Sequence, residues 1–194
     1  MSMRVSLLSL VLMSTTCVAL HAQESPCAML KTKDTAVLRA FLQEQQSLRQ
    51  SPCLTVVIKQ LGQLRDVEAI HLLVGYLDYL EPKTGLLPNG GATVRPRYPA
   101  GGALFQIGKP ATLELLSAIQ AGGSPKTREN AVKTYESVYR DDLSSGIRIL
   151  KTAELLAKTE EERRRLNEAR QKLIDACNAR GDRSVEACND AAAE

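Results

Sequence analysis

The chain has 194 residues, of which 25 are Lys or Arg and 22 are Asp or Glu, so its formal net charge is +3 at neutral pH. This near balance argues against nucleic-acid binding, because neutralising a phosphate backbone requires a basic stripe or face. The single basic cluster, Arg163–Arg165, directly follows Glu160–Glu162, and opposite charges one helical turn apart offset each other.

Residues 1–22 have the three parts of a signal peptide. A basic start with Arg4 precedes an almost wholly apolar run from Val5 to Met13, and small residues up to Ala22 follow. The run is shorter than the roughly 20 apolar residues that span a bilayer. We therefore expect cleavage after Ala22, export to the periplasm or the extracellular space, and no transmembrane span in the mature chain. An uncleaved N-terminal anchor is the alternative.

Four cysteines remain after residue 22: Cys27, Cys53, Cys177 and Cys188. An even number of cysteines in an exported chain predicts disulfides. Of the three possible pairings we favour Cys27–Cys53 and Cys177–Cys188, because each closes a local loop at one end of the chain. Free buried thiols are the alternative. We expect no zinc site, because no two cysteines are closely spaced and His71 is the only histidine after residue 22.

The chain from Asp34 to residue 80 is predicted to be helical. Asp34 is placed to cap a helix that ends near residue 50. Pro52 suits the first position of the next helix, in which apolar residues recur at steps of three and four. Asp66 is then a natural N-cap for a further helix, so residues 52–80 form a helical pair.

The same apolar spacing recurs further along the chain. The stripe of Leu61, Leu64, Ile70 and Leu73 is followed 43 residues later by Leu104, Ile107, Leu113 and Leu116. In this second copy, Gly108 can take the left-handed conformation that ends a helix, and Pro110 suits the first turn of the next helix. A third, looser copy has stripes within 131–138 and 147–153, with Asp141, Asp142 or Ser144 as candidate caps. Each pair exposes an apolar face unless a neighbour covers it, which is the logic of a solenoid.

Residues 61–73 and 103–116 carry a resemblance to the HEAT-like (armadillo-type) helical repeat family. With the third copy, the resemblance covers roughly residues 52–155. It implies a right-handed α-solenoid of antiparallel helix pairs that acts as a protein-binding scaffold. Enzymatic members of the family attach or remove bilin chromophores, but no residue of this chain independently supports that chemistry.

After the third copy, Thr159 and Glu162 have the spacing of a capping box at the start of a long helix. The fold class is therefore predicted as all-α, with about three HEAT-like helix pairs between helical caps. The predicted organisation is a signal peptide (1–22), an N-terminal capping segment and helix (23–51), repeats (52–155, as 52–80, 98–121 and 126–155, with a long loop at 81–97) and C-terminal capping helices (156–194).

The long loop between the first two copies carries the candidate partner-binding residues. Its Gly and Pro content precludes a helix, and loops of this length are often functional. The candidates are Tyr76, Tyr79, Leu86, Leu87, Arg95, Arg97 and Tyr98. Alternatively, the loop folds over its own repeats with the leucines as a plug, and the tyrosines are half-buried at helix ends.

No arrangement of residues predicts catalysis. His71 is the one candidate general base, and no nucleophile can be paired with it from the sequence. We predict no catalytic, metal-binding or cofactor-binding residues and a non-catalytic scaffold or adaptor that binds a protein or peptide, in the groove lined by the second helices or at the loop. The alternatives are a small-ligand carrier with the 81–99 segment as a lid, an enzyme with His71 in a deep pocket, and an architectural module without a site.

Overall fold

The computed structural model describes residues 27–49, 51–82, 98–121 and 123–179, together with residues 188, 190 and 191. The predicted signal peptide, 1–22, and most of the predicted loop, 83–97, lie outside the described residues. Every regular element in the described part is helical, which confirms the all-α class. The α-helices are α1 (Thr35–Glu44), α2 (Leu54–Gln63), α3 (Ile70–Val74), α4 (Pro99–Ile107), α5 (Thr112–Gln120), α6 (Pro125–Val138), α7 (Leu143–Leu155) and α8 (Glu160–Asn178), and the 3-10 helices are η1 (Ala28–Leu30), η2 (Val67–Ala69) and η3 (Lys109–Ala111).

Side-chain caps start the helices where the sequence predicts them. Asp34 accepts a hydrogen bond from the backbone N–H of Ala36 at 3.0 Å, and Asp66 accepts one from Glu68 at 3.1 Å. Thr159 and Glu162 form a reciprocal capping box at the start of α8. Among the three candidate caps of α7, Asp142 is the one that accepts a backbone N–H. These contacts satisfy donors that the first turn of a helix leaves without partners.

Several helix boundaries differ from the prediction, including that of α3, which ends at Val74 although the helical pair was expected to reach residue 80. The first helix ends at Glu44 rather than near residue 50, and Arg49 follows with a left-handed φ of 46°. The second helix begins at Leu54 with Cys53 as its N-cap, so Pro52 precedes the helix instead of opening it. The connection between the two helices is therefore longer than predicted and contains both the left-handed residue Arg49 and the disulfide-bonded Cys53.

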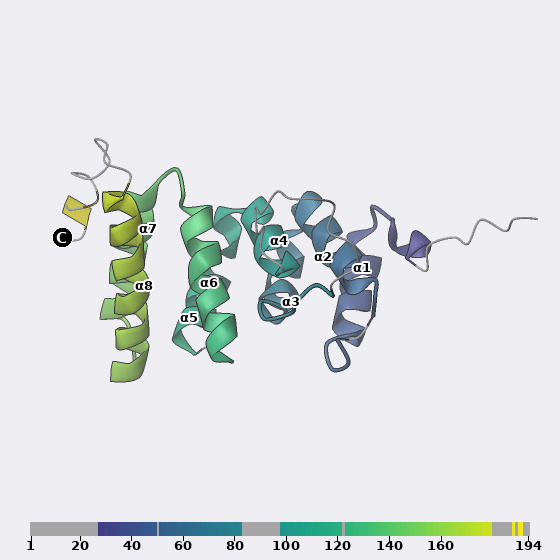
Figure 1. The fold of residues 1–194 in the computed structure, drawn as a ribbon, viewed down its shortest axis with the longest axis horizontal. Coiled ribbons are helices and arrows are strands. Elements are labelled where there is room, and N and C mark those ends of the chain that lie inside the picture. The colour runs from purple at the N-terminus through teal and green to yellow at the C-terminus, as the bar shows by residue number, and fades with distance from the viewer. Residues whose placement is uncertain are drawn as a thin grey trace, which may run out of the picture.

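The helices follow one another along the long axis of the molecule (Figure 1). Helix α2 packs against α4, and α4 packs against α6, while α3 packs against α5. The closest approach is at Gly62 of α2, where an added Cβ would lie 2.5 Å from the Cα of Ala103 in α4. Leu61 and Leu104, one on each of these helices, are fully buried. A single apolar core runs through all of these contacts.

The repeat spacing changes at the turn of the second copy. Arg65 and Asp66 separate Leu64 from η2, whereas Gly108 alone separates Ile107 from η3. Gly108 has a φ of 85°, a conformation that favours glycine. The turn is thus one residue shorter, and the second helices are related by 42 residues rather than 43.

This shift corrects one residue of the predicted apolar stripe. Leu113 was expected to match Ile70, but its side chain is 78% exposed. Leu115, which stands 42 residues after Leu73, is fully buried, as Leu73 is. Leu115 therefore takes the core position, and Leu113 lies on the outside of the helix.

The third copy also departs from the expected arrangement. A regular stack would place α7 beside α5 as the second helix of its pair. Instead α8 packs against α5, and α7 packs along α8. The apolar side of α8 consists of Leu166, Ala169, Leu173 and Cys177, all buried. The predicted C-terminal cap therefore covers the surface left by the second copy.

Two disulfides link the cysteines in the favoured pairing, Cys27–Cys53 and Cys177–Cys188. All four side chains are buried. In the part of the chain that the structure describes, no helix combines the length and the apolar character needed to span a bilayer.

Candidate functional site

A long groove runs over the second helices of the first two copies. Its volume is about 550 Å³, and it extends from the end of α1 across α3 and α5 to the turn before α6. We call this hollow the long groove; its lining residues are Gln46, Arg49, His71, Val74, Gly75, Asp78, Glu114, Ser117, Ala118, Ala121, Gly123, Ser124 and Thr127. Eight of these thirteen residues have polar or charged side chains, but more of the exposed lining is apolar than polar, so the groove combines hydrogen-bonding groups with apolar surface.

A polar network centred on Asp78 joins three parts of the groove. The Arg49 guanidinium donates to Asp78 Oδ1 at 2.6 Å and to the carbonyl of Gly75 at 2.7 Å. Ser124 Oγ donates to Asp78 Oδ2 at 3.3 Å and also caps α6 by accepting the N–H of Thr127. The network ties the segment after α1 to the end of α3 and the start of α6, so the groove has a defined end.

His71 and Glu114 face each other across the groove. His71 Nδ1 lies 3.4 Å from Glu114 Oε2, and the two side chains are 82% and 42% exposed. The enzyme alternative required an enclosed pocket around His71, and this imidazole is open to solvent. The pair instead places one basic and one acidic side chain where a bound molecule can reach both.

Tyr76 and Tyr79 are core residues. Tyr76 is fully buried and its hydroxyl donates to the carbonyl of Leu42 at 2.6 Å, while Tyr79 is 7% exposed and packs edge-on against the Tyr76 ring. Burial raises the pKa of the Tyr76 phenol, and the nearby Arg49 guanidinium opposes that rise. Their burial corrects the interpretation of these two tyrosines as a recognition surface, and they are more deeply buried than the alternative of half-buried tyrosines at helix ends predicts.

The other candidates are divided between the described and undescribed residues. Tyr98 is half-buried at the start of α4, and the ammonium group of Lys126 lies 5.1 Å from the centre of its ring. This contact joins the start of α4 to the start of α6. The candidates Leu86, Leu87, Arg95 and Arg97 lie outside the described residues.

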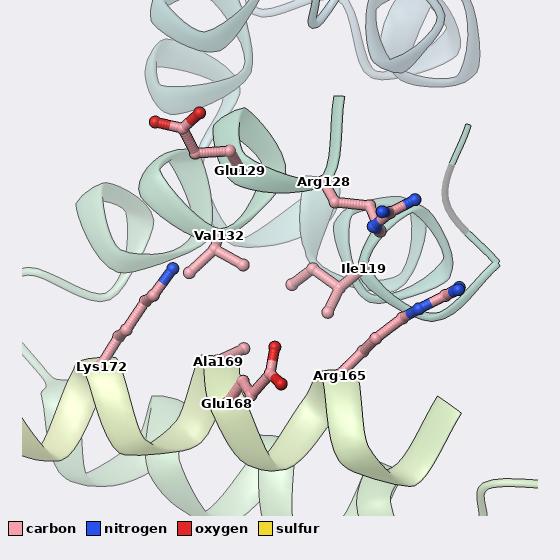
Figure 2. A pocket seen from close by; sticks show the side chains of 8 residues that line it. All are labelled: Ile119, Arg128, Glu129, Val132, Arg165, Glu168, Ala169 and Lys172. Atoms are coloured by element: carbon pink, nitrogen blue, oxygen red, sulfur yellow. The ribbon is translucent and has the colours of Figure 1, made fainter. Parts of the chain in front are cut away.

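A second, smaller hollow lies between α5, α6 and α8 (Figure 2). Its volume is about 150 Å³. We call it the basic pocket; it is lined by Ile119, Arg128, Glu129, Val132, Arg165, Glu168, Ala169 and Lys172. Apolar side chains form its floor, and charged side chains surround the opening.

Sequence reasoning missed the polar residues that shape both hollows. The partners Arg49 and Asp78 are 29 residues apart, and Asp78 and Ser124 are 46 residues apart. No local spacing indicates such contacts. The sequence did predict that the second helices of the repeats line a groove. That prediction identifies α3 and α5, but it does not identify the individual polar side chains.

Among the described residues, no group of three or more His, Cys, Asp or Glu side chains is arranged to hold a metal ion. No protein-family model, no curated protein and no solved structure matches this chain.

Proposed function

We propose that this protein is an exported, non-catalytic adaptor of HEAT-like helix pairs that binds a segment of a partner protein in the long groove. The observation that carries the proposal is the groove itself, which successive elements of the chain form together and which is open along its length. Small-molecule sites are typically concave and mostly apolar, with few polar groups. This groove of about 550 Å³ is open rather than enclosed and has charged and polar side chains along it, which favours an extended peptide segment instead.

The charges in the groove suggest the chemistry of the partner. Arg49 is engaged by Asp78, so that these two charges offset each other. Glu114 remains a partly exposed carboxylate, with Nδ1 of the His71 imidazole 3.4 Å from its Oε2. A Lys or Arg side chain of the partner would find a carboxylate at this position, and Ser117 would lie beside the bound backbone.

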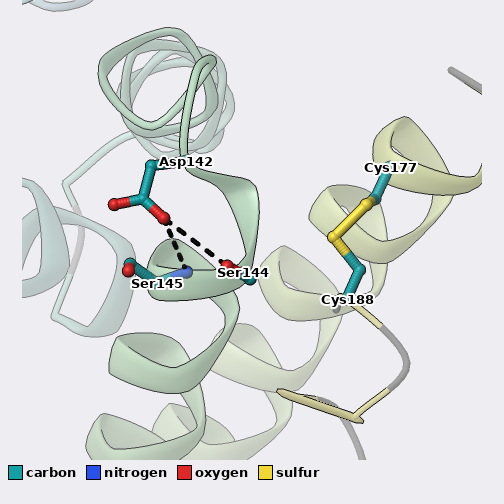
Figure 3. Close-up of a disulfide and its surroundings, with 5 residues drawn as sticks. All are labelled: Asp142, Ser144, Ser145, Cys177 and Cys188. Atoms are coloured by element: carbon teal, nitrogen blue, oxygen red, sulfur yellow. Dashed lines mark hydrogen bonds between the residues drawn. A yellow bond between two sulfur atoms is a disulfide. The ribbon is translucent and has the colours of Figure 1, made fainter. Parts of the chain in front are cut away.

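The cysteines support a location outside the cytoplasm. Cys27–Cys53 links the segment before α1 to the N-cap of α2, and Cys177–Cys188 links the last turn of α8 to the C-terminal segment (Figure 3). Disulfides persist in oxidising compartments and are rare in cytosolic proteins. Residues 1–22 are the segment that we expect to direct export.

Site-specific photo-crosslinking tests the binding site. A p-benzoylphenylalanine residue at Ser117, an exposed position of α5 in the groove, should give one discrete adduct with a protein from the envelope fraction of the source cells. The matched control is the same residue at Ser137, an exposed position of α6 that does not line the groove. We expect no adduct there.

The Glu114→Arg variant separates specific binding from adhesion. It reverses the charge that we assign to partner recognition, while the partly exposed side chain has little structural role. The Ser117 adduct should weaken strongly in this background, and the crosslinked segment should contain Lys or Arg. Equal adducts at Ser117 and Ser137, or an adduct indifferent to Glu114→Arg, would refute the proposal.

A further inference from the structure

The floor of the basic pocket is apolar and fits one small group. Ile119, Val132 and Ala169 come from three different helices, and each is at most 8% exposed. Figure 2 shows these three side chains converging between the charged residues. A volume of about 150 Å³ matches a cavity that accommodates one benzene-sized group. The pocket therefore suits a single side chain rather than an extended peptide.

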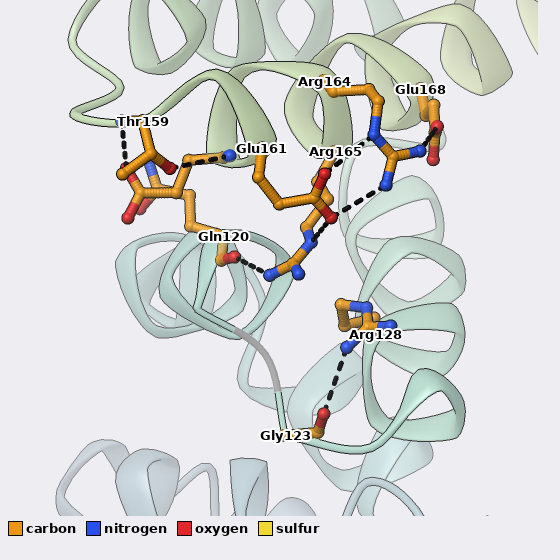
Figure 4. A network of polar contacts seen from close by, with 9 residues as sticks. Gln120, Gly123, Arg128, Thr159, Glu161, Arg164, Arg165 and Glu168 are labelled. Atoms are coloured by element: carbon orange, nitrogen blue, oxygen red, sulfur yellow. Dashed lines mark hydrogen bonds and ion pairs between the residues drawn. The ribbon is translucent and has the colours of Figure 1, made fainter.

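Two guanidinium groups beside this floor are held in place by the backbone. Arg165 donates to the carbonyl of Gln120 at 2.6 Å and to Glu161 at 2.9 Å, which uses two of its five N–H groups. Arg128 donates to the carbonyl of Gly123 at 3.1 Å. Gln120 is the last residue of α5, and Gly123 lies between α5 and α6 (Figure 4). Side chains ordered in advance lose less conformational entropy when a ligand binds.

The acidic side chains of the pocket are already engaged by other cations. The Glu129 carboxylate accepts hydrogen bonds from Lys133 at 2.6 Å and Lys126 at 2.9 Å, which lower its pKa to about 2. Glu168 pairs with Arg164 at 2.5 Å. Glu129 and Glu168 are therefore each held by cations of their own helix, Lys126 and Lys133 in α6 and Arg164 in α8.

The pocket and its ion-pair partners carry an excess of positive charge. Three cations, Arg128, Arg165 and Lys172, and two carboxylates, Glu129 and Glu168, line the pocket, so the lining itself has one more positive than negative charge. The carboxylates are engaged by three further cations, Lys126, Lys133 and Arg164, which do not line it. Such a site attracts an anion, and the planar guanidinium suits a carboxylate in particular.

We propose that the basic pocket binds the C-terminal residue of a polypeptide. Its α-carboxylate lies against Arg128 and Arg165, and its apolar side chain enters the floor formed by Ile119, Val132 and Ala169. In the C-terminal residue of a polypeptide, the α-carbon bears both a carboxylate and the side chain. This arrangement matches a pocket in which guanidinium groups lie next to an apolar floor. This inference does not depend on the function of the long groove.

A titration with two small probes tests the site. Methyl and amide NMR signals of the disulfide-bonded protein are followed with N-acetyl-L-valine and with N-acetyl-L-valinamide, which lacks the carboxylate. N-acetyl-L-valine should shift the methyl signals of Ile119 and Val132 in a saturable manner, and the amide should not. Sodium acetate and inorganic phosphate serve as anions without the side chain and should bind at least about tenfold more weakly, because they cannot fill the floor.

Variants distinguish recognition from a general charge effect. Arg128→Gln should weaken N-acetyl-L-valine binding at least about tenfold, because it removes a charged hydrogen-bond donor. Lys172→Glu reverses an exposed charge at the opening, leaves the fold intact and should also weaken binding. The control Arg148→Gln removes one positive charge from the exposed face of α7 and should leave binding unchanged.

Three results would overturn the inference: equal shifts with the acid and the amide, equal binding of acetate or phosphate, and equal losses in Arg128→Gln and Arg148→Gln. Glu114→Arg distinguishes this site from the long groove. It should strongly weaken the Ser117 adduct and leave N-acetyl-L-valine binding unchanged, so that either proposal can fail without the other.

Discussion

The contact between α2 and α4 makes a strong prediction about Gly62. An ideal Cβ at this position would lie 2.5 Å from Ala103 Cα, 2.8 Å from Ala103 Cβ and 2.8 Å from the side-chain oxygen of Gln106. The Gln106 side chain can turn away, but Ala103 Cα belongs to the backbone of α4. Because carbon atoms pack at about 3.5–4.0 Å, Gly62→Ala must push the two helices apart by roughly 1 Å.

The magnitude follows from two opposing effects. Overpacking a tight core contact costs about 1–3 kcal/mol, and a backbone obstacle places Gly62→Ala near the upper end of that range. Alanine is better than glycine in a helix by about 1 kcal/mol. We therefore expect a net loss of about 2 kcal/mol in the free energy of unfolding. For a chain of this size, this loss lowers Tm by roughly 4–8 °C.

Gly102 provides a matched control. It also lies in a helix, α4, but nothing is found within 4 Å of a Cβ added there. Gly102→Ala should therefore stabilise the protein by about 0.5–1 kcal/mol. Urea denaturation followed by far-UV circular dichroism measures both changes. A Gly62→Ala variant as stable as the parent, or a Gly102→Ala variant destabilised to the same extent, would refute the packing of α2 on α4 through Gly62.

Three further predictions concern a buried hydroxyl, a solvent-exposed ion pair and two helix caps. Tyr135→Phe should lower the free energy of unfolding, measured by urea denaturation, by about 1 kcal/mol, because the buried hydroxyl donates to the carbonyl of Gly146 at 3.0 Å. Burial also raises the pKa of Tyr135, so the parent protein should lose stability as the pH rises above about 10, and Tyr135→Phe should lose less stability over the same range. The hydrogen bonds from Lys133 and Lys126 lower the pKa of Glu129 from 4.5 to about 2. The stability that the ionised Glu129 contributes to the protein is therefore complete above pH 4.5 and is lost as the pH falls towards 2, and Glu129→Gln should reduce this dependence of Tm on pH. Ser124→Ala and Thr159→Ala should each cost about 1 kcal/mol as lost N-caps, but only Ser124→Ala should also weaken the Ser117 crosslink, because Ser124 lines the long groove.

Local signals predicted the helices and their beginnings well. Asp34, Asp66 and Thr159 cap helices as their positions indicate, because an N-cap depends on residues two or three positions away. The disulfide pairing was also predictable, since each pair closes a local loop. The caps depend on separations of two or three residues, where sequence spacing translates directly into distance, whereas the disulfides span 26 and 11 residues and were paired because each lies at one end of the chain.

The register of the second copy required information that spacing does not contain. Counting residues placed Leu113 on the apolar stripe, because the matching leucines of both copies stand 43 residues apart. The single-residue turn at Gly108 rotates the following helix by one residue, about 100°, relative to that expectation. Leu115 is turned inward and Leu113 outward as a result. A repeat pattern thus identifies helices more reliably than the faces they bury.

The candidate site was less predictable than the fold for a related reason. Tyr76 and Tyr79 were interpreted from their place beside a long loop, yet the packing of α1 against α3 encloses Tyr76. The polar residues that do line the long groove, such as Asp78 and Glu114, have ordinary sequence surroundings. Their proximity depends on tertiary contacts between helices, which no single helix encodes.

The turn between α5 and α6 forms a shared wall of the two hollows. Gly123 and Ser124 line the long groove, while the carbonyl groups of Gln120 and Gly123 hold the guanidinium groups of the basic pocket. A displaced turn would therefore alter both sites, although no lining residue belongs to both. Arg165 comes from α8, which packs against α5 where a regular stack would place α7. The departure from a regular repeat is thus the feature that brings Arg165 to the turn, and a stack with α7 in that position would lack the basic pocket.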